Sequence, residues 1–63
     1  MLVKFTDGQT NKPIAINSNH VVIVFTSVAE DGTESTVISV LNGNVVVKES
    51  YLDTLGKLQS NWL

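Results

Sequence analysis

His20 is the only side chain in this sequence whose ordinary pKa lies near neutrality, so acid–base or nucleophilic chemistry would have to begin there. A nucleophilic site also needs a serine within reach of the imidazole and a carboxylate that orients the ring. The preceding Ser18 and Asn19 do not fill these roles unless the fold brings a serine and a carboxylate into line. We interpret His20 as a strand-entry histidine hydrogen-bonded to a turn, and we predict that the protein is not an enzyme.

Metal and cofactor sites have few candidate residues. The chain has no cysteine, and a lone histidine does not make a metal site. Gly8, Gly32 and Gly43 each follow Asp or Asn in a hairpin-like context, and none precedes a helix as a phosphate-binding loop requires. The sequence therefore predicts neither a metal nor a cofactor.

The charge pattern argues against nucleic acid as the expected partner. The chain has four lysines, no arginine and six carboxylates, whereas binding to phosphate backbones normally uses a clustered basic face. Three of the carboxylates, Glu30, Asp31 and Glu34, gather around one turn, which is typical of a solvated hairpin tip.

Residues 1–5 lack the pattern of a signal peptide, and no apolar run approaches the roughly 18 residues of a membrane span. Absence of cysteine fits a reducing compartment. We therefore expect a soluble, cytoplasmic protein with no membrane partner.

The apolar pattern predicts extended segments at residues 2–6, 14–16, 20–29, 34–41 and 44–48. Turn residues separate them: Asp7-Gly8 through Pro13, then Asp31-Gly32, then Asn42-Gly43. The last pair predicts a type I′ turn, in which both central residues have positive φ. We predict a single α+β domain over residues 1–63, with a small antiparallel sheet of four to five strands and one C-terminal helix.

The helix has a recognisable start. Ser50 is a natural N-cap, with Asp53 at the third helical position. The apolar stripe expected to lie on the sheet is Tyr51, Leu55, Leu58 and Trp62, with Leu52 beside it. Gly56, inside the helix, either allows close approach to a strand or only weakens the last turn.

The strand at 20–29 is apolar on both faces, with Val21, Ile23 and Phe25 on one and Val22, Val24 and Val28 on the other. One short helix cannot cover two faces, so we predict a homo-oligomer, most simply a two-fold dimer. On periodicity alone, either face of this strand is a candidate for the interface. The candidate residues are Val22 and Val24, or Ile23 and Phe25.

The C-terminal residues Trp62 and Leu63 are further interface candidates. Trp62 either packs into a neighbouring molecule, as tryptophans in binding hot spots do, or continues the helix stripe and covers the core.

Three segments carry a family resemblance: I-N-S-N-H-V at 16–21, T-V-I-S-V-L-N-G-N-V-V-V-K-E-S at 36–50, and the helical Y-L-D-T-L-G-K-L that follows. Together they resemble the FlbD family of small flagellar and swarming-motility proteins. The resemblance implies a β-rich body, an N-G hairpin and a short helix.

The strand order with a final helix also looks like a trimmed LytTR-type DNA-binding domain, and short proteins of this kind occur in phage genomes too. We predict a non-enzymatic protein–protein interaction or regulatory module with an unidentified protein partner. The alternative is a small nucleic-acid-binding transcriptional regulator of the LytTR-like type.

Overall fold

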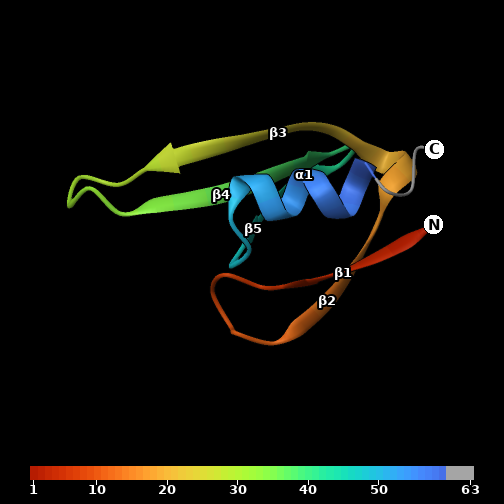
Figure 1. Ribbon diagram of the computed structural model, residues 1–63, viewed down its shortest axis with the longest axis horizontal. Coiled ribbons are helices and arrows are strands. Elements are labelled where there is room, and N and C mark those ends of the chain that lie inside the picture. The colour runs from red at the N-terminus through yellow and green to blue at the C-terminus, as the bar shows by residue number, and fades with distance from the viewer. Residues whose placement is uncertain (60–63) are drawn as a thin grey trace.

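The computed structural model describes residues 1–59, and within them it confirms an α+β fold of antiparallel strands followed by a C-terminal helix (Figure 1). The elements in chain order are β1 (Leu2–Thr6), β2 (Pro13–Asn17), the short 3-10 helix η1 (Ser18–His20), β3 (Val21–Val28), β4 (Glu34–Val40), β5 (Gly43–Val47) and α1 (Tyr51–Gln59). The five strands divide into two sheets, β1–β2 and β3–β4–β5, where the sequence had suggested one.

The two sheets join at one corner, where the end of β1 meets the end of β5. Asp7 forms a bridge with Val47, the Lys48 amide donates to the Thr6 carbonyl at 2.8 Å, and the Gly8 amide donates to the Val46 carbonyl at 2.8 Å. The strands therefore curve from one sheet into the other, and α1 lies across the opening between them (Figure 1).

The core lies where the helix and both sheets meet. Its buried apolar residues are Val3, Phe5, Ile16, Ile38, Val47 and Leu58. Because side chains alternate along a strand, Ile38 in the middle of β4 points to this core while its neighbours on β4 point away. Ile38 and Leu58 are both 0% exposed and belong to one cluster, so the helix packs on the face of the β3–β4–β5 sheet that carries Ile38.

The β3–β4 hairpin confirms the predicted turn at Asp31-Gly32. The Gly32 amide donates to the Ala29 carbonyl at 2.9 Å, and the Ala29 amide donates to the Thr33 carbonyl at 2.8 Å. Gly32 has φ of 88°, a conformation that glycine adopts at little cost. A hydrogen bond from the Thr33 amide to Asp31 Oδ1, 2.9 Å long, lowers the pKa of this exposed carboxyl below its ordinary value.

The β4–β5 hairpin forms, but the predicted type I′ turn centred on Asn42 and Gly43 is wrong. Val40 pairs with Gly43, so Leu41 and Asn42 are the central residues, and Asn42 is not among the described residues with positive φ. Gly43, with φ of 155°, is instead the first residue of β5. Shifting the register by one residue would turn the buried residues of β5 to the other face, so core packing outweighs the local turn preference.

The helix begins as predicted, with the Asp53 amide donating to Ser50 Oγ at 3.1 Å. Of the predicted stripe, Leu58 is buried and Leu55 is half-buried, whereas Tyr51 is 39% exposed. Leu52, expected beside the stripe, is 76% exposed, and Thr54, outside it, is buried. Trp62 lies outside the described residues. Thr54 and Leu58 are four positions apart, so the same side of the helix is buried in two successive turns.

Two glycine substitutions test these contacts. A Cβ at Gly56 would meet nothing within 4 Å, so the glycine does not serve close packing. Gly56→Ala is expected to raise the free energy of unfolding by about 1 kcal/mol, because alanine has the higher helix propensity.

Gly8→Ala is expected to have the opposite effect on stability, because its Cβ would lie 2.8 Å from Val46 Cγ1 and 3.2 Å from the Val46 carbonyl oxygen. Overpacking there should cost about 1–3 kcal/mol.

Urea denaturation followed by circular dichroism measures both changes. If Gly56→Ala destabilised the protein, the helix would have to pack more closely on that side than the structure shows.

Candidate functional site

A β-bulge at the start of β3 decides which side chains face the core. Val21 pairs with Val40 and Ile23 pairs with Ser39, so Val22 is an extra residue without a partner on β4. A bulge interrupts the alternation of faces. Val21 therefore packs against the core, and the prediction that it shares a face with Ile23 and Phe25 is wrong.

One face of the β3–β4–β5 sheet is covered by the rest of the chain. Val24 of β3 lies opposite Ile38 and packs against the core cluster. The candidate pair Val22 and Val24 is therefore divided, because Val24 is half-buried whereas Val22 is 64% exposed. The helix takes the Val24 face, which answers the question that periodicity left open.

The other face, which we call the open face, carries Ile23, Phe25, Val37 and Val46. Phe25 lies opposite Val37 in the register, and Val37 lies opposite Val46. These flanking side chains leave Val37 only 6% exposed, while Ile23 is 54% and Phe25 39% exposed. The second candidate pair is thus brought together on one uncovered apolar surface.

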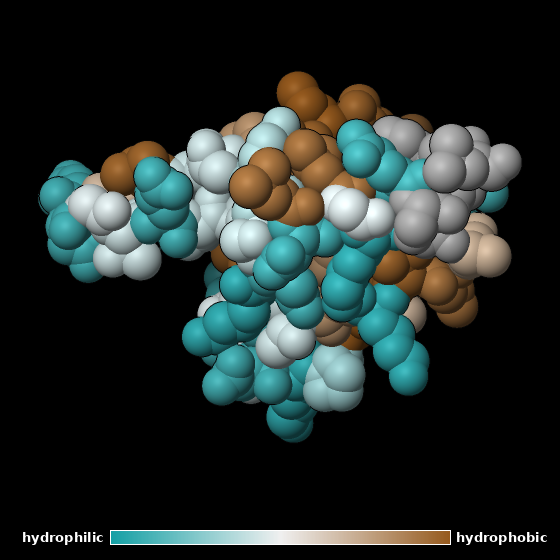
Figure 2. Space-filling view, in the orientation of Figure 1, coloured by the Kyte–Doolittle hydropathy of each residue, from teal (hydrophilic) through white to brown (hydrophobic). Residues whose placement is uncertain are grey.

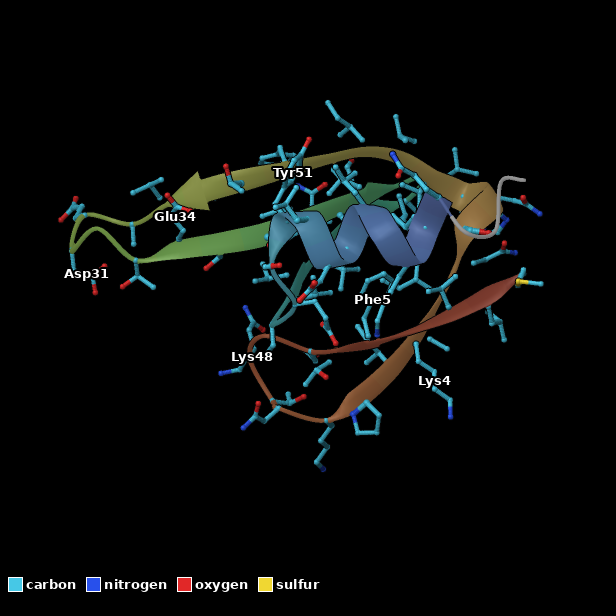
Figure 3. All side chains as sticks on the ribbon, viewed as in Figure 1. Lys4, Phe5, Asp31, Glu34, Lys48 and Tyr51 are labelled. Atoms are coloured by element: carbon cyan, nitrogen blue, oxygen red, sulfur yellow. The ribbon has the colours of Figure 1, made fainter. Side chains whose placement is uncertain are left out.

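The space-filling view shows how polarity is distributed. Apolar side chains lie along the margin where β3 runs, and the tip of the β3–β4 hairpin is hydrophilic (Figure 2). Asp31 and Glu34 mark this acidic tip (Figure 3). Val37 and Val46 are not among the predicted interface residues, although the alternation of side chains along their strands contains the signal.

An open cleft of about 500 Å³ lies between the β3–β4 hairpin and the start of α1. Thr26, Thr36, Glu49 and Tyr51 are among its lining residues. Glu49 is not free to act as a base here, because both of its oxygens are hydrogen-bonded to β1: Oε1 accepts from the Thr6 amide at 3.0 Å, and Oε2 accepts from Thr6 Oγ1 at 3.1 Å.

Lys57 completes this polar contact from the last turn of the helix. Its Nζ lies 3.8 Å from Glu49 Oε2, donates to the Lys4 carbonyl at 2.8 Å, and lies 5.1 Å from the centre of the Phe5 ring (Figure 3 labels Lys4 and Phe5). Burial raises the pKa of Glu49, but the Thr6 hydrogen bonds and the Lys57 ammonium outweigh it, so the pKa lies below its ordinary value. The arrangement ties the β5–α1 connection to β1.

The residues with potential for acid–base chemistry lie apart. His20 is exposed at the end of η1, and its backbone carbonyl accepts a hydrogen bond from the Leu41 amide at 3.1 Å. The acidic tip lies beyond the far end of β3, an eight-residue strand that begins directly after His20. Within residues 1–59, no three side chains of the types His, Cys, Asp and Glu gather closely enough to hold a metal ion.

No helix in the described part of the chain has the length and apolar character required to cross a membrane.

The C-terminal interface candidates lie beyond the last described residue, Gln59. Trp62 and Leu63, the remaining interface candidates, lie outside the described residues, so their part in any surface stays a prediction.

No family model, no curated protein and no solved structure matches this chain. The FlbD-like and LytTR-like resemblances therefore stay predictions.

The Glu49 contact predicts a specific pH dependence of stability. A carboxylate whose pKa is lowered in the folded state stabilises the protein above its ordinary value of 4.5, and this contribution is lost as the pH falls through the folded-state pKa. Glu49→Gln should lower the free energy of unfolding at neutral pH by about 1–2 kcal/mol, and its stability should fall less on acidification than that of the parent protein.

Glu34→Gln, an exposed change at the hairpin tip, serves as the control and should stay within about 0.5 kcal/mol of the parent. Urea titrations across the acid range give all three curves. Parallel curves for the parent and Glu49→Gln would contradict the assigned contact.

Proposed function

We propose that this chain is a non-enzymatic protein-interaction module that associates with a second copy of itself through the exposed apolar surface of β3. The observation that carries the proposal is the exposure of Ile23 and Phe25 on the open face, around the buried Val37. On this proposal, regulation of a protein partner is exerted by the dimer.

The packing of the helix and of the β1–β2 hairpin supports this proposal. The helix and the β1–β2 hairpin both pack on the Val24 face, so within residues 1–59 the open face keeps Ile23 and Phe25 exposed. Val21–Val28 contains no charge and no proline, and an exposed strand of this kind is an aggregation hazard on a monomer. Association removes the hazard and contributes roughly 25 cal/mol for each Å² of apolar surface that it covers.

The small size of the chain points the same way. Domains of this length are only marginally stable alone, and oligomerisation is a common source of additional stability.

The alternative function, binding of nucleic acid, has less support from the positions of the lysines. The Lys57 ammonium is held by Glu49 and by the Lys4 carbonyl. Lys4 and Lys48 lie toward opposite ends of the β1 side of the molecule (Figure 3), whereas binding to phosphate backbones normally uses clustered basic side chains. Any motility role rests on the FlbD-like sequence resemblance alone.

Ile23→Lys tests the proposed surface. A lysine there would replace an apolar side chain at the interface with a charge, so the dimer dissociation constant should rise by roughly tenfold or more while the monomer stays folded. Leu52→Lys is the control, because Leu52 is also exposed, at 76% against 54% for Ile23, but lies on α1, which packs on the opposite face. Sedimentation equilibrium should show twice 6.8 kDa for the parent and Leu52→Lys, and 6.8 kDa for Ile23→Lys.

A parent protein that sediments as a folded monomer at high micromolar concentration would refute self-association. Salt-dependent gel shifts of random duplex DNA at low micromolar protein would favour the nucleic-acid alternative, whereas a pull-down with one dominant protein would favour a protein partner.

A further inference from the structure

We infer that the outer edge of β3 pairs antiparallel with the same edge of a second copy, so that the two β3–β4–β5 sheets form one continuous sheet across a two-fold axis. This inference rests on the proposed function and specifies how the two copies meet.

The hydrogen-bond pattern of the hairpin identifies the backbone groups that are available. The Ala29 amide donates to the Thr33 carbonyl, so Ala29 and Thr33 form a hydrogen-bonded pair. In an antiparallel ladder such pairs alternate with pairs whose backbone groups point away from each other. Counting back along the β3–β4 register, the residues whose N–H and C=O groups face β4 are Ile23, Phe25 and Ser27. Those whose groups face outward, which we call the outward residues, are Val24, Thr26 and Val28.

The outward residues have no strand beside them in the described chain. β3 pairs only with β4 and is the end strand of its sheet. A row of unpaired backbone donors and acceptors is a template for another strand. The outer edge of β3 is therefore ready to accept hydrogen bonds from, and donate them to, an extended chain.

The usual protections of an edge strand are weak on β3. Edge strands are commonly kept short, or carry proline or charged side chains. In the two-stranded sheet, β2 follows this pattern with five residues and Pro13 at its start. β3 has eight residues without proline or charge, and its bulge lies only at the Val22 end.

The placement of charge favours a second copy in the antiparallel direction. The carboxylates of the hairpin, Glu30, Asp31 and Glu34, all lie at one end of β3. Antiparallel pairing keeps the acidic tips of the two copies at opposite ends, about 27 Å apart for a strand of this length. This separation exceeds the Debye length of about 8 Å, whereas parallel pairing would place the tips side by side. The tip of each copy would lie beside residues 17–20 of the other, which carry no carboxylate.

The area that a stable dimer requires must come from side chains beside the edge as well as from its backbone. Each partner in a typical specific interface buries about 800 Å², close to a fifth of the 4423 Å² that this chain exposes. Backbone pairing covers only a narrow ribbon, so side chains on both sides of the edge must supply the rest. Exposed apolar side chains lie along this strand, namely Val22, Ile23, Phe25 and Val28.

The two-fold axis has one preferred position. Outward residues must meet outward residues, and placing Phe25 opposite Phe25 of the partner subunit satisfies this, because Val24 then meets Thr26 of the partner subunit. Residues 22–28 overlap in this register, and an aromatic pair lies next to the axis on the open face, where cross-strand aromatic pairs are stabilising.

Amide hydrogen exchange on the parent protein tests the pairing directly. If the edges pair, the amides of the outward residues Val24, Thr26 and Val28 become protected as the concentration is raised through the dimer dissociation constant. A dimer in which these amides stay unprotected would overturn edge pairing but leave the proposed self-association standing. A folded monomer at every concentration would overturn both.

Thr26→Pro is the matching variant. It removes an N–H that faces outward and leaves the β3–β4 hydrogen bonds in place, so the fold should persist. The dimer dissociation constant should rise by roughly tenfold to a hundredfold, because each copy loses a hydrogen bond at the interface. Thr26→Val keeps the N–H and should remain dimeric. If Thr26→Pro dimerised as tightly as Thr26→Val, edge pairing would be refuted.

A cross-link tests the register. The chain has no cysteine, so Phe25→Cys introduces one thiol per copy beside the expected axis. Mild oxidation should link the Phe25→Cys dimer and leave Leu52→Cys, exposed on the helix, unlinked. Equal cross-linking of the two variants would exclude the Phe25-centred register.

Discussion

Ile38, in the middle of β4, has no exposed surface and belongs to one apolar cluster with Phe5 of β1 and Leu58 of α1. Within residues 1–59, this cluster is where the helix, the β1–β2 hairpin and the β3–β4–β5 sheet meet. A chain of this length buries only about 60% of the surface that its unfolded form exposes, so it has little other apolar burial to replace this contact. The side of β4 that carries Ile38 therefore determines where the helix and the first hairpin lie.

Apolar contacts are not directional, and polar contacts specify how the parts are joined. Thr6 illustrates this at the corner between the sheets. Its amide and hydroxyl both donate to Glu49, and its carbonyl accepts from the Lys48 amide. All of its hydrogen-bonding groups are thus used to hold the end of β1 against the segment between β5 and α1. Glu49, which lines the cleft beside this segment, is already engaged in holding the fold together.

The same shortage of chain explains the surface that remains exposed. A sheet has two faces, and here the helix and the first hairpin pack on the same one. The open face keeps Ile23 and Phe25 exposed, and the edge of β3 keeps its backbone groups unpaired in the described chain. Face and edge belong to the same strand, so a second molecule that pairs with the edge of β3 also lies beside Ile23 and Phe25. For this reason we relate the function of the chain to this surface rather than to the cleft.

Local chemistry in the sequence determined the elements of this fold. The turn at Asp31-Gly32, the Ser50 cap and the run of β-branched residues each depend on neighbours within a few positions, so the hairpins, the helix start and the α+β class were predictable. The two apolar faces of β3 were also visible from their period of two. What the pattern could not show was which face is covered, because both are apolar.

The tertiary structure decided that question through contacts between residues far apart in the chain. The bulge at Val22 turns Val21 toward the core and breaks the alternation that the sequence predicted. Packing of β5 against β4 overrides the turn preference of Asn42-Gly43. On the helix, Thr54 rather than Tyr51 is the residue of the first turn that is buried. The bond between Thr6 and Glu49 joins residues 43 positions apart, and no local pattern indicates it. Local preferences select φ and ψ within a few residues, whereas the covered face, the register and the exposed edge follow from the packing of distant segments against Ile38.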